Sequence, residues 1–415
     1  MSPEAEYRPG DVVITGLGTV NPLGADVEST WSALHEGICA VRALEHEWVT
    51  HHDLPVRIGA PLAVDPAEML PPRQLRRLDR ASQCALLASR QAWEQAGAPQ
   101  VAPQRLAVSV SPGMGPVLSV MEAWDTLRDK GPRRVLPTAV PALMPNAPAA
   151  AIGIELGAHG GIHAPVSACA SGAEAIAYGA DLISLGRADV VVAGGTDAAL
   201  HPMTVAAFGA MRALSTRNAD PQTASRPFAP DRDGFVLGEG AGLLVLERAE
   251  HAIARGAQVL AVLAGSGVTA DAYDVARPEP SGTEQERALL LALERAGLEP
   301  SSVGHVNAHA TSTPAGDVVE AGVLARTVPN AAVSATKSAT GHLLGGAGGL
   351  EAVLTVMALQ ERWAPPTLLP AGVDPELTRL GLDVVGPQGR DLPDLTAAAS
   401  TSFGFGGHNV ALVFT

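Results

Sequence analysis

A single cysteine stands where an apolar run meets a helix-forming run, in the sequence PVSACASGAEAIA at residues 165–177. We expect Cys169 to lie at a tight turn from a strand into a helix, where unpaired backbone N–H groups and the positive end of the helix dipole favour thiolate over thiol. The N–H groups of such a turn could also hold a developing oxyanion. A free cysteine among alanine and glycine is more often a small buried hydrophobe, so this stretch alone leaves both a nucleophilic and a structural cysteine open.

A second group of polar residues follows an apolar strand in the last third of the chain. Residues 303–316, VGHVNAHATSTPAG, read as a strand that opens into a loop with His309, Thr311 and Thr313. A helix is expected next, and acidic residues in its first turn are well placed near its positive end. These acidic residues are Asp317 and Glu320. Taken singly, His309 is more often a structural histidine than a catalytic one.

The same pattern recurs in residues 333–350, VSATKSATGHLLGGAGGL, with Lys337 and His342 in the loop and a glycine-rich helix start after them. Of the 28 basic residues only Lys130 and Lys337 are lysine. A lysine kept against that bias indicates a site that needs a compact point charge rather than a planar guanidinium. Taken singly, His342 is also more often structural.

Composition bounds the class of protein. With 415 residues and 47% hydrophobic content the chain can bury a large core, as two domains or one large α/β unit. A net charge of −15 argues against a nucleic-acid or anionic-membrane binder, because phosphate contacts need clustered cations. Cys39, Cys84 and Cys169 are too few and too scattered for a disulfide framework or a thiolate metal site, which favours a reducing cytosol.

Two segments bear on targeting and on membrane insertion. The longest charge-free run, residues 135–154, contains four prolines that would break a membrane helix. The first 13 residues have no apolar core, so no secretory signal is expected. The sequence therefore predicts a cytoplasmic protein that does not enter a membrane.

Apolar strands alternate with amphipathic helices along the first half of the chain, which predicts an α/β fold with a mostly parallel sheet covered by helices. One long amphipathic helix is expected over residues 73–97, with arginines near its start that form either a solvated face or a docking patch for an acidic partner. The other predicted strands are residues 12–20, 105–111 and 189–197, and the other predicted helices are residues 26–36, 174–185 and 203–214.

The two parts of the chain echo each other. VVITGLGTV at residues 12–20 is matched by LAVLAGSGV at residues 260–268, and an aromatic-glycine segment precedes an apolar strand at both residues 234–247 and residues 402–414. We infer two related halves, residues 1–255 and 256–415. The first would carry Cys169 and the larger insertions.

Two stretches that resemble cofactor- or metal-binding motifs lack residues that those motifs require. The third glycine of a dinucleotide fingerprint would fall at Asn21, and a calcium loop at DRDG would place Ala229 and Gly240 where acidic ligands are needed. No cofactor and no metal are therefore expected.

Taken together, four ordered motifs resemble those of the elongating β-ketoacyl-[acyl carrier protein] synthases, which belong to the thiolase superfamily. They are SACASG with Cys169, NAHATSTPAGD with His309, TKSATGH with Lys337 and His342, and the terminal SFGFGGHN. The likeness runs the whole length of the chain. It implies a thiolase-like fold in αβαβα layers, with central sheets sandwiched by helices, and an acyltransferase that extends an acyl chain on acyl carrier protein (ACP) by two carbons in fatty acid biosynthesis.

The resemblance also implies roles for single residues. Cys169 would accept the acyl group, and His309 and His342 would donate N–H groups to the enolate that malonyl-ACP leaves when it loses CO2. Lys337 would tune the field around His342 and be held by Glu351. The other implied roles are oxyanion binding by the backbone N–H groups of Cys169 and Phe403, gating by Phe403, pantetheine binding by Thr311 and Thr313, substrate contacts by Met114 and Phe405, and support by Asp317 and Glu320.

The implied partners are ACP and a second copy of the chain, with a heterodimer possible, and no nucleic acid or membrane. ACP is acidic, and the face at residues 73–80 together with Arg212 would contact it. The sequence departs from the family at Ala310, where glycine is usual, at Ala170, where threonine or serine is common beside the nucleophile, and in the loop SPGMGP at residues 111–116. That loop borders the acyl pocket in the family, so the preferred chain length is open.

Two alternatives stay open at this point, and a third is discounted. One is a ketosynthase of a specialised type II polyketide or polyene pathway, because one fold hosts different substrates. The second is a non-catalytic chain-length-factor-like partner subunit, which normally lacks the cysteine present here as Cys169. The third is a thiolase that uses coenzyme A substrates, which would need a second cysteine after Cys169, where the sequence has none.

Overall fold

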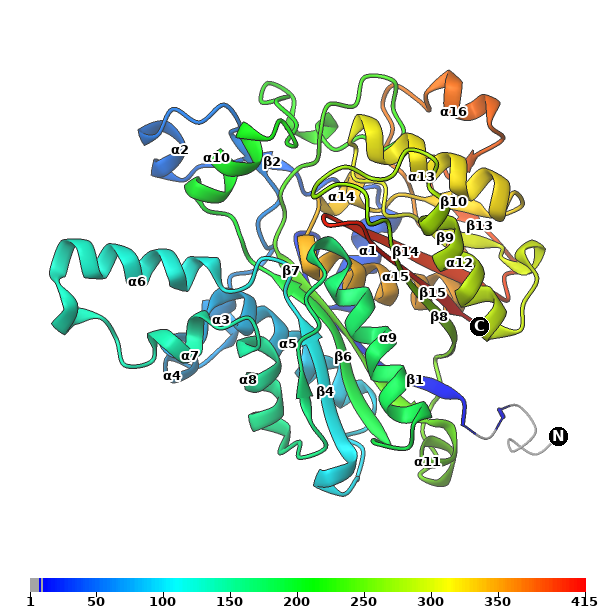
Figure 1. The fold of residues 1–415 in the computed structure, drawn as a ribbon, viewed down its shortest axis with the longest axis horizontal. Helices are drawn as coiled ribbons and strands as arrows, with labels where there is room; N and C mark the ends of the chain where they lie inside the picture. The colour runs from blue at the N-terminus through cyan, green and yellow to red at the C-terminus, as the bar shows by residue number, and fades with distance from the viewer. Residues whose placement is uncertain (1–6, 9) are drawn as a thin grey trace.

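The computed structural model describes residues 7–8 and 10–415 and shows an α/β molecule around one 11-stranded sheet (Figure 1). The strand order is β12-β10-β9-β14-β15-β8-β1-β7-β6-β4-β5. The expectation about a secretory signal rests largely on residues 1–6 and 9, which lie outside the described residues.

The first half of the sheet is built from five strands. β1 pairs with β7 antiparallel, β7 with β6 antiparallel, and β6 with β4 and β4 with β5 parallel. Every residue of β1 is buried, as its apolar sequence predicts for a strand covered on both faces. The bounds are β1 Val12–Val20, β4 Leu106–Ser111, β5 Ile162–His163, β6 Val190–Asp197 and β7 Gly240–Arg248.

The second half repeats the same order of pairings. β8 pairs with β15 antiparallel, β15 with β14 antiparallel, and β14 with β9 and β9 with β10 parallel. β12 adds a further parallel strand at the edge. The halves join at β1 and β8 through only Val13↔Val262 and Ile14↔Ala261. The bounds are β8 Ala261–Ala270, β9 His305–Asn307, β10 Ala332–Ser334, β12 Asp383–Val384, β14 Ala398–Gly404 and β15 His408–Phe414.

The expectation of a mostly parallel sheet is wrong, because each half mixes both pairings. β14 and β15 form a tight hairpin whose turn contains Gly406 and Gly407, both with φ near +80°. A direct hairpin can only join antiparallel strands. Ser402 to Gly404, which the sequence places in a segment before the last strand, are themselves the end of strand β14.

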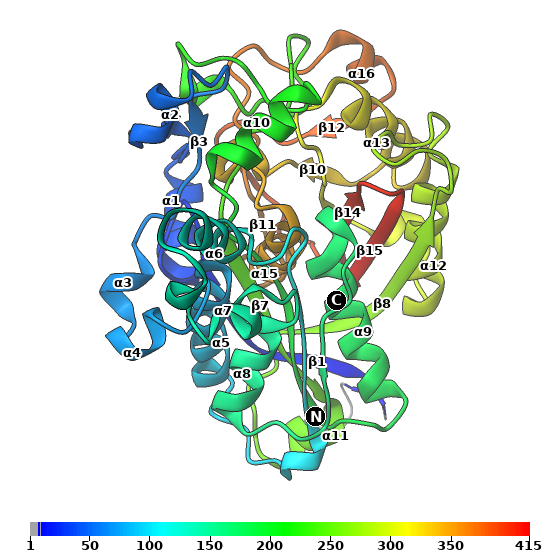
Figure 2. The same ribbon diagram turned by 60° about the vertical axis from the view of Figure 1, so that its left-hand side comes forward.

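Two helices lie between the two halves of the sheet. α9 (Ser171–Ser184) and α15 (Ala347–Glu361) each contact strands of both halves, and Figure 2 shows β14 and β15 beside α9. α5 (Arg80–Gln95) and α8 (Ala147–Leu156) cover the first half from outside, and α12 (Thr283–Ala296) covers the second, with α13 (Pro314–Thr327) against α12. The predicted αβαβα layering and duplicated halves are confirmed.

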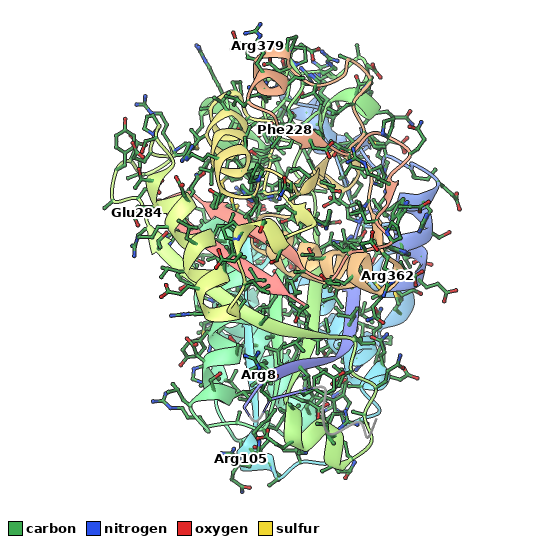
Figure 3. The ribbon with its side chains drawn as sticks, turned by 90° about the vertical axis from the view of Figure 1, so that its right-hand side faces the viewer. Arg8, Arg105, Phe228, Glu284, Arg362 and Arg379 are labelled. Carbon is green, nitrogen blue, oxygen red and sulfur yellow. The ribbon has the colours of Figure 1, made fainter. Side chains whose placement is uncertain are left out.

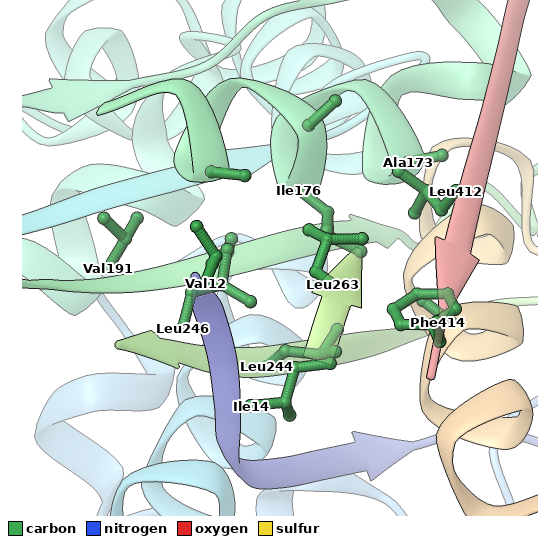
Figure 4. Packing of buried hydrophobic residues seen from close by; sticks show 14 of the residues in the cluster. Val12, Ile14, Ala173, Ile176, Val191, Leu244, Leu246, Leu263, Leu412 and Phe414 are labelled. Atoms are coloured by element: carbon green, nitrogen blue, oxygen red, sulfur yellow. The ribbon is translucent and has the colours of Figure 1, made fainter. Parts of the chain in front are cut away.

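The largest apolar cluster fills the space between these layers (Figure 4). Ile14 and Leu244 from the first half meet Ile176 of α9, with Leu412 and Phe414 from the second half against the same cluster. Burial of apolar surface from both halves is the main term that holds them together, since the strands of the two halves share few hydrogen bonds.

The remaining elements connect these layers. α6 (Val117–Lys130) and α7 (Ala139–Leu143) extend away from the body in Figure 1. The others are α1 (Val27–His35), α2 (Glu47–His51), α3 (Pro66–Met69), α4 (Pro72–Leu75), α10 (Pro202–Ala210), α11 (Ala249–Ala254), α14 (Lys337–Thr340), α16 (Pro375–Arg379), β2 (Arg42–Ala43), β3 (Ile58–Gly59), β11 (Trp363–Ala364) and β13 (Arg390–Asp391).

The long helix expected over residues 73–97 is two helices, α4 and α5. The break occurs because Asp79 caps α5, accepting a hydrogen bond from Ala81 N at 2.9 Å. Arg80 is only partly exposed, and its guanidinium is held by the buried Glu239 at 2.8 and 3.0 Å rather than left free in a basic patch. The predicted helix over residues 203–214 ends at Ala210.

Within the described residues, no helix combines the length and the hydropathy that a membrane crossing requires.

Candidate active site

The structure places Cys169 in a short 3-10 turn, Ala168–Ala170, directly before α9. Ala168 has a φ of +50°, a conformation that non-glycine residues rarely adopt and that packing must hold in place. Ser171 Oγ fixes the turn by donating to Ala168 O at 2.6 Å and accepting from Ser167 N at 2.9 Å. Gly404 lies so close that a Cβ there would meet Ser167 O at 2.5 Å.

The backbone N–H groups favour a Cys169 thiolate as expected, but burial outweighs them. Burial raises the pKa of Cys169 to about 11, and the opposing influences of Lys337 and of backbone N–H groups do not outweigh it. Desolvation wins because the turn is enclosed by segments from both halves of the chain. The sulfur is therefore a thiol at neutral pH.

The second backbone donor at the sulfur comes from Phe405. The N–H groups of Phe405 and of Cys169 itself are directed at the sulfur and lower its pKa. The second donor is therefore Phe405 and not Phe403, which the family resemblance implies. Phe403 instead packs its ring against His309, with ring centroids 6.0 Å apart.

His309 and His342 lie together, with ring centroids 5.3 Å apart and planes at 86°. Burial lowers the pKa of both rings well below its usual value, and the charge of Lys337 lowers each further. Both imidazoles are therefore neutral near pH 7, and each carries one N–H. Neither nitrogen of His342 has a hydrogen-bond partner among the described residues, although both are buried. A buried unpaired donor of this kind is ready for a ligand oxygen.

Lys337 lies closer to His309 than the sequence analysis expected. Lys337 Nζ is 3.4 Å from His309 Nδ1, and it also binds Glu351 on α15. Lys337 is 1% exposed, so its charge acts in a region of low dielectric. Burial raises the pKa of Glu351 to about 7. The geometry makes Lys337 a neighbour of His309, while its charge influences both imidazoles.

Two buried carboxylates hold the loop that carries His309. Glu320 accepts hydrogen bonds from His309 N at 2.8 Å and Ala310 N at 2.6 Å. Asp317 accepts from Ser312 N at 3.1 Å and from Phe228 N at 2.8 Å, and Phe228 is labelled in Figure 3. Both carboxylates therefore position the loop through its backbone and not through the imidazole.

The alanine that replaces a common family glycine does not strain this loop. Ser312 has a φ of +71°, whereas Ala310 is not among the described residues with positive φ. The left-handed position therefore lies two residues beyond Ala310. Ala310 therefore does not need the positive φ that would favour glycine at this position.

One cavity of about 170 Å³ collects these groups. Thr311 and Thr313 lie on its wall with their hydroxyl oxygens 3.0 Å apart. Met114, on the loop after β4, also lines the cavity. Lys337, Glu351 and Asp317 lie behind the wall. The sequence-predicted residues on the wall are Met114, Cys169, His309, Thr311, Thr313, Glu320, His342, Phe403 and Phe405.

Asp197, which no sequence motif singles out, holds the loop that carries Met114. Asp197 is fully buried at the end of β6 and accepts hydrogen bonds from Gly113 N at 2.8 Å, Gly345 N at 2.7 Å and Met114 N at 3.3 Å. Burial raises its pKa to about 7. An acidic residue that ends an otherwise apolar strand, as in DVVVAGGTD, was the available signal.

Two family models match this chain, the N-terminal domain of β-ketoacyl synthase over residues 10–252 and the C-terminal domain over residues 260–369. The chain belongs to the β-ketoacyl synthase family. Among curated members, the 3-oxoacyl-[acyl-carrier-protein] synthase 2 of Mycobacterium bovis is 43% identical over 410 residues, covering 97% of this chain and 96% of the relative. The enzyme of the same name from Staphylococcus aureus is 41% identical, with 97% of both chains covered.

Solved structures of β-ketoacyl synthases share the whole fold. A β-ketoacyl synthase from Burkholderia phymatum superposes with a TM-score of 0.89 at 36% identity, covering 97% of this chain and 98% of that one. The ketosynthase of a type II polyketide synthase, solved with its acyl carrier protein, also gives 0.89, at 29% identity and with 98% and 99% covered. The thiolase-like architecture of the β-ketoacyl synthase is therefore shown over its full length.

Proposed function

We propose that this β-ketoacyl synthase is a 3-oxoacyl-[acyl carrier protein] synthase that lengthens an ACP-bound acyl chain by two carbons, using malonyl-ACP, in fatty acid biosynthesis. One observation carries the proposal: the Cys169 sulfur and two neutral imidazoles line one enclosed cavity, and His342 presents unpaired ring nitrogens there. Decarboxylative condensation needs this combination of a nucleophile and neutral N–H donors.

The first half-reaction is acyl transfer. The Cys169 sulfur attacks the thioester carbon of acyl-ACP, the bond to the pantetheine sulfur breaks, and the thiol proton ends on the departing pantetheine sulfur. The backbone N–H groups of Cys169 and Phe405 are directed to this point and stabilise the oxyanion of the tetrahedral intermediate. The positive charge of Lys337 lowers the cost of the transient thiolate.

The second half-reaction begins with malonyl-ACP. Breaking the bond to the carboxylate releases CO2 and leaves the electron pair as an enolate, whose oxygen is stabilised by N–H groups of His309 and His342. No carboxylate base is needed, because the carbanion forms without removal of a proton. The low pKa of both rings keeps them neutral donors throughout.

Condensation completes the cycle. The enolate carbon attacks the carbonyl of the Cys169 thioester, the carbon–sulfur bond breaks, and the product leaves as β-ketoacyl-ACP. The Cys169 thiolate then takes up one proton. The two N–H groups that served acyl transfer serve this tetrahedral intermediate as well.

The remaining assignments belong to the same proposal. Thr311 and Thr313 bind the pantetheine arm, and Met114 contacts the acyl chain. Phe403 controls passage between the two half-reactions, and Phe405, whose ring lies 6.5 Å from that of Phe208, contacts the substrate. A Met114→Gly variant is expected to accept a wider range of acyl chains, whereas an unchanged chain-length profile would show that Met114 does not set the preferred chain length.

The test of the proposed function is the intact mass of the protein after incubation with a series of acyl-ACPs. We expect one acyl group per chain, mapped by peptide mass to Cys169, and release of CO2 when malonyl-ACP follows. Acylation of Cys39 or Cys84 with an inert Cys169 would contradict the proposal.

A specialised polyketide pathway remains the second candidate, because several structural neighbours are ketosynthases of that kind, including the ishigamide ketosynthase/chain length factor at 28% identity and a TM-score of 0.87. The higher identity to the fatty-acid enzymes favours the first candidate. Exclusive loading of unsaturated polyketide intermediates onto Cys169 would reverse this preference. The presence of Cys169, His309 and His342 in one cavity argues against a non-catalytic subunit.

Three further assignments extend the proposal. We divide the chain into halves at residues 255 and 256, supported by the repeated strand pairings and by the gap between the two family matches. A homodimer, with a heterodimer as the alternative, follows from the family. A reducing cytosol is supported by three cysteines that are all free.

A further inference from the structure

The cavity wall contains a glutamine that takes no part in the proposed chemical steps. Gln285 lies in the first turn of α12, is 2% exposed and lines the cavity. Its neighbour Glu284, labelled in Figure 3, ties this turn to the end of β8, since its carbonyl accepts a hydrogen bond from Thr269 Oγ1 at 2.6 Å. Gln285 is thus held on a well-anchored turn at the cavity.

The side-chain amide of Gln285 has no hydrogen bond with any described residue, and its oxygen is wholly buried. Buried amide groups in folded proteins nearly always have partners, because leaving them unpaired is costly. An amide supplies both an acceptor and two donors. The unpaired group therefore indicates a partner that enters the cavity.

The neighbouring polar side chains on this wall are already paired. Asn409 Nδ2 donates to Asp271 Oδ1 at 2.6 Å, and Asp271 Oδ2 accepts from Glu279 N at 3.0 Å. Thr311 and Thr313 pair with each other through their hydroxyls. Among these groups the amide of Gln285 stands out as unsatisfied.

We propose that Gln285 is a substrate-binding residue whose carboxamide pairs with an amide of the pantetheine arm. The inference rests on the proposed function, which brings that arm into this cavity. The arm carries amide groups with one N–H and one C=O each, which match the acceptor and donors of Gln285. A saturated acyl chain has no group that could satisfy the buried carboxamide, so the acyl end of the substrate does not explain it.

The position of Gln285 on the wall agrees with this assignment. Gln285 lines the cavity together with Thr311 and Thr313 from the loop between β9 and α13, whereas Met114 lies on the loop after β4. The residues assigned to the arm and those assigned to the acyl chain thus come from different segments. Gln285 belongs to the first group.

The experiment measures the second-order rate of Cys169 acylation, by intact mass, with two thioesters of the same acyl group. Acyl-pantetheine carries the amides of the arm, and the acyl ethanethiol ester carries none. We expect Gln285→Leu to lower the rate with acyl-pantetheine by about tenfold, the effect of one or two lost hydrogen bonds, and to leave the rate with the ethyl thioester unchanged. The unchanged ethyl thioester rate also shows that the Cys169 turn is intact.

Gln104→Leu is the matched control, because Gln104 is exposed and does not line the cavity. It should leave both rates unchanged. Equal losses with both thioesters, or no loss with either, would overturn the role of Gln285. Failure of the wild-type protein to accept an acyl group from either thioester would instead contradict the proposed function, so the two failures are distinguishable.

Discussion

The turns that precede α9 and α15 share one geometry and differ in chemistry. Each is a 3-10 turn, Ala168–Ala170 and Leu344–Gly346, and each begins with a non-glycine residue at a positive φ, +50° at Ala168 and +51° at Leu344. Cys169 is the second residue of the first turn. The second residue of the other turn is Gly345.

The comparison separates the role of the backbone from that of the side chain. A Cβ on Gly345 would meet Gly113 N at 2.1 Å, so this turn has no room for a nucleophile. The second half supplies the imidazole of His342, three residues upstream, and the charge of Lys337. A duplicated backbone thus carries a sulfur in one copy and its partners in the other.

Removing the Cys169 sulfur should have the largest effect on activity. Cys169→Ala should abolish acylation and chain extension entirely, because no other side chain on the described cavity wall is a thiol. The imidazole side should still release CO2 from malonyl-ACP. Intact mass and trapped CO2 measure the two sides separately, and loss of both would show that the sides are not independent.

Removing the imidazole of His342 tests the decarboxylation half-reaction. His342→Ala should lower the rate of CO2 release from malonyl-ACP by about 10²–10³-fold, the usual cost of losing one oxyanion donor. Acylation of Cys169 should fall far less. His305→Ala is the matched control, since His305 is also fully buried but does not line the cavity. Equal effects on both half-reactions would argue for a structural role of His342.

The thiol pKa gives a pH test of the nucleophile side. Because burial raises the pKa of Cys169 to about 11, the thiolate fraction should increase about tenfold per pH unit from pH 7 to 10. Alkylation of Cys169 by iodoacetamide, followed by peptide mass, should rise accordingly without a plateau. A plateau below pH 8 would restore the helix-dipole expectation made from the sequence.

The smallest expected effect is a change in melting temperature at Asp197. This residue links the loop of Met114 to the turn Leu344–Gly346. Its folded pKa of about 7 lies above the ordinary value of 3.8, so its stabilising contribution is fully present below pH 3.8 and is lost as pH rises through 7. The melting temperature of the wild type should therefore exceed that of Asp197→Asn by more at pH 5.5 than at pH 8.

Asp374→Asn is the control for this measurement. A hydrogen bond from Glu376 N and the nearby Arg232 hold the pKa of Asp374 below its usual value, although burial opposes them. Its contribution is lost only as pH falls below this range. The difference in melting temperature between wild type and Asp374→Asn should stay constant from pH 5.5 to 8, and a matching slope for both variants would contradict the prediction for Asp197.

The sequence predicted the features that depend on local order. The buried strand at residues 12–20, the turn before α9 and the loops with His309 and His342 follow from apolar runs that end in small or polar residues. The family motifs predicted that these loops meet. The roles assigned to single residues stay predictions until the experiments above are done.

The features that the sequence did not predict depend on contacts between distant segments. The raised pKa of Cys169 comes from enclosure by both halves, and the break before α5 depends on Asp79, which also accepts a hydrogen bond from Ser119 N at 3.0 Å. Phe403 and Phe405 are separated by a single residue, so sequence spacing alone could not say which N–H faces the sulfur. Gln285 carries no motif at all.

The glycines around the cavity constrain how this enzyme could change its preference during evolution. A Cβ on Gly113 would meet Ala168 O at 2.6 Å, and one on Gly172 would meet Gly345 O at 2.7 Å. Mutations at these positions would push main chain against main chain and disturb the turn itself. New specificity therefore has to arise where the wall already bears side chains, as at Met114 and Gln285, and a library for redesign should be restricted to such positions.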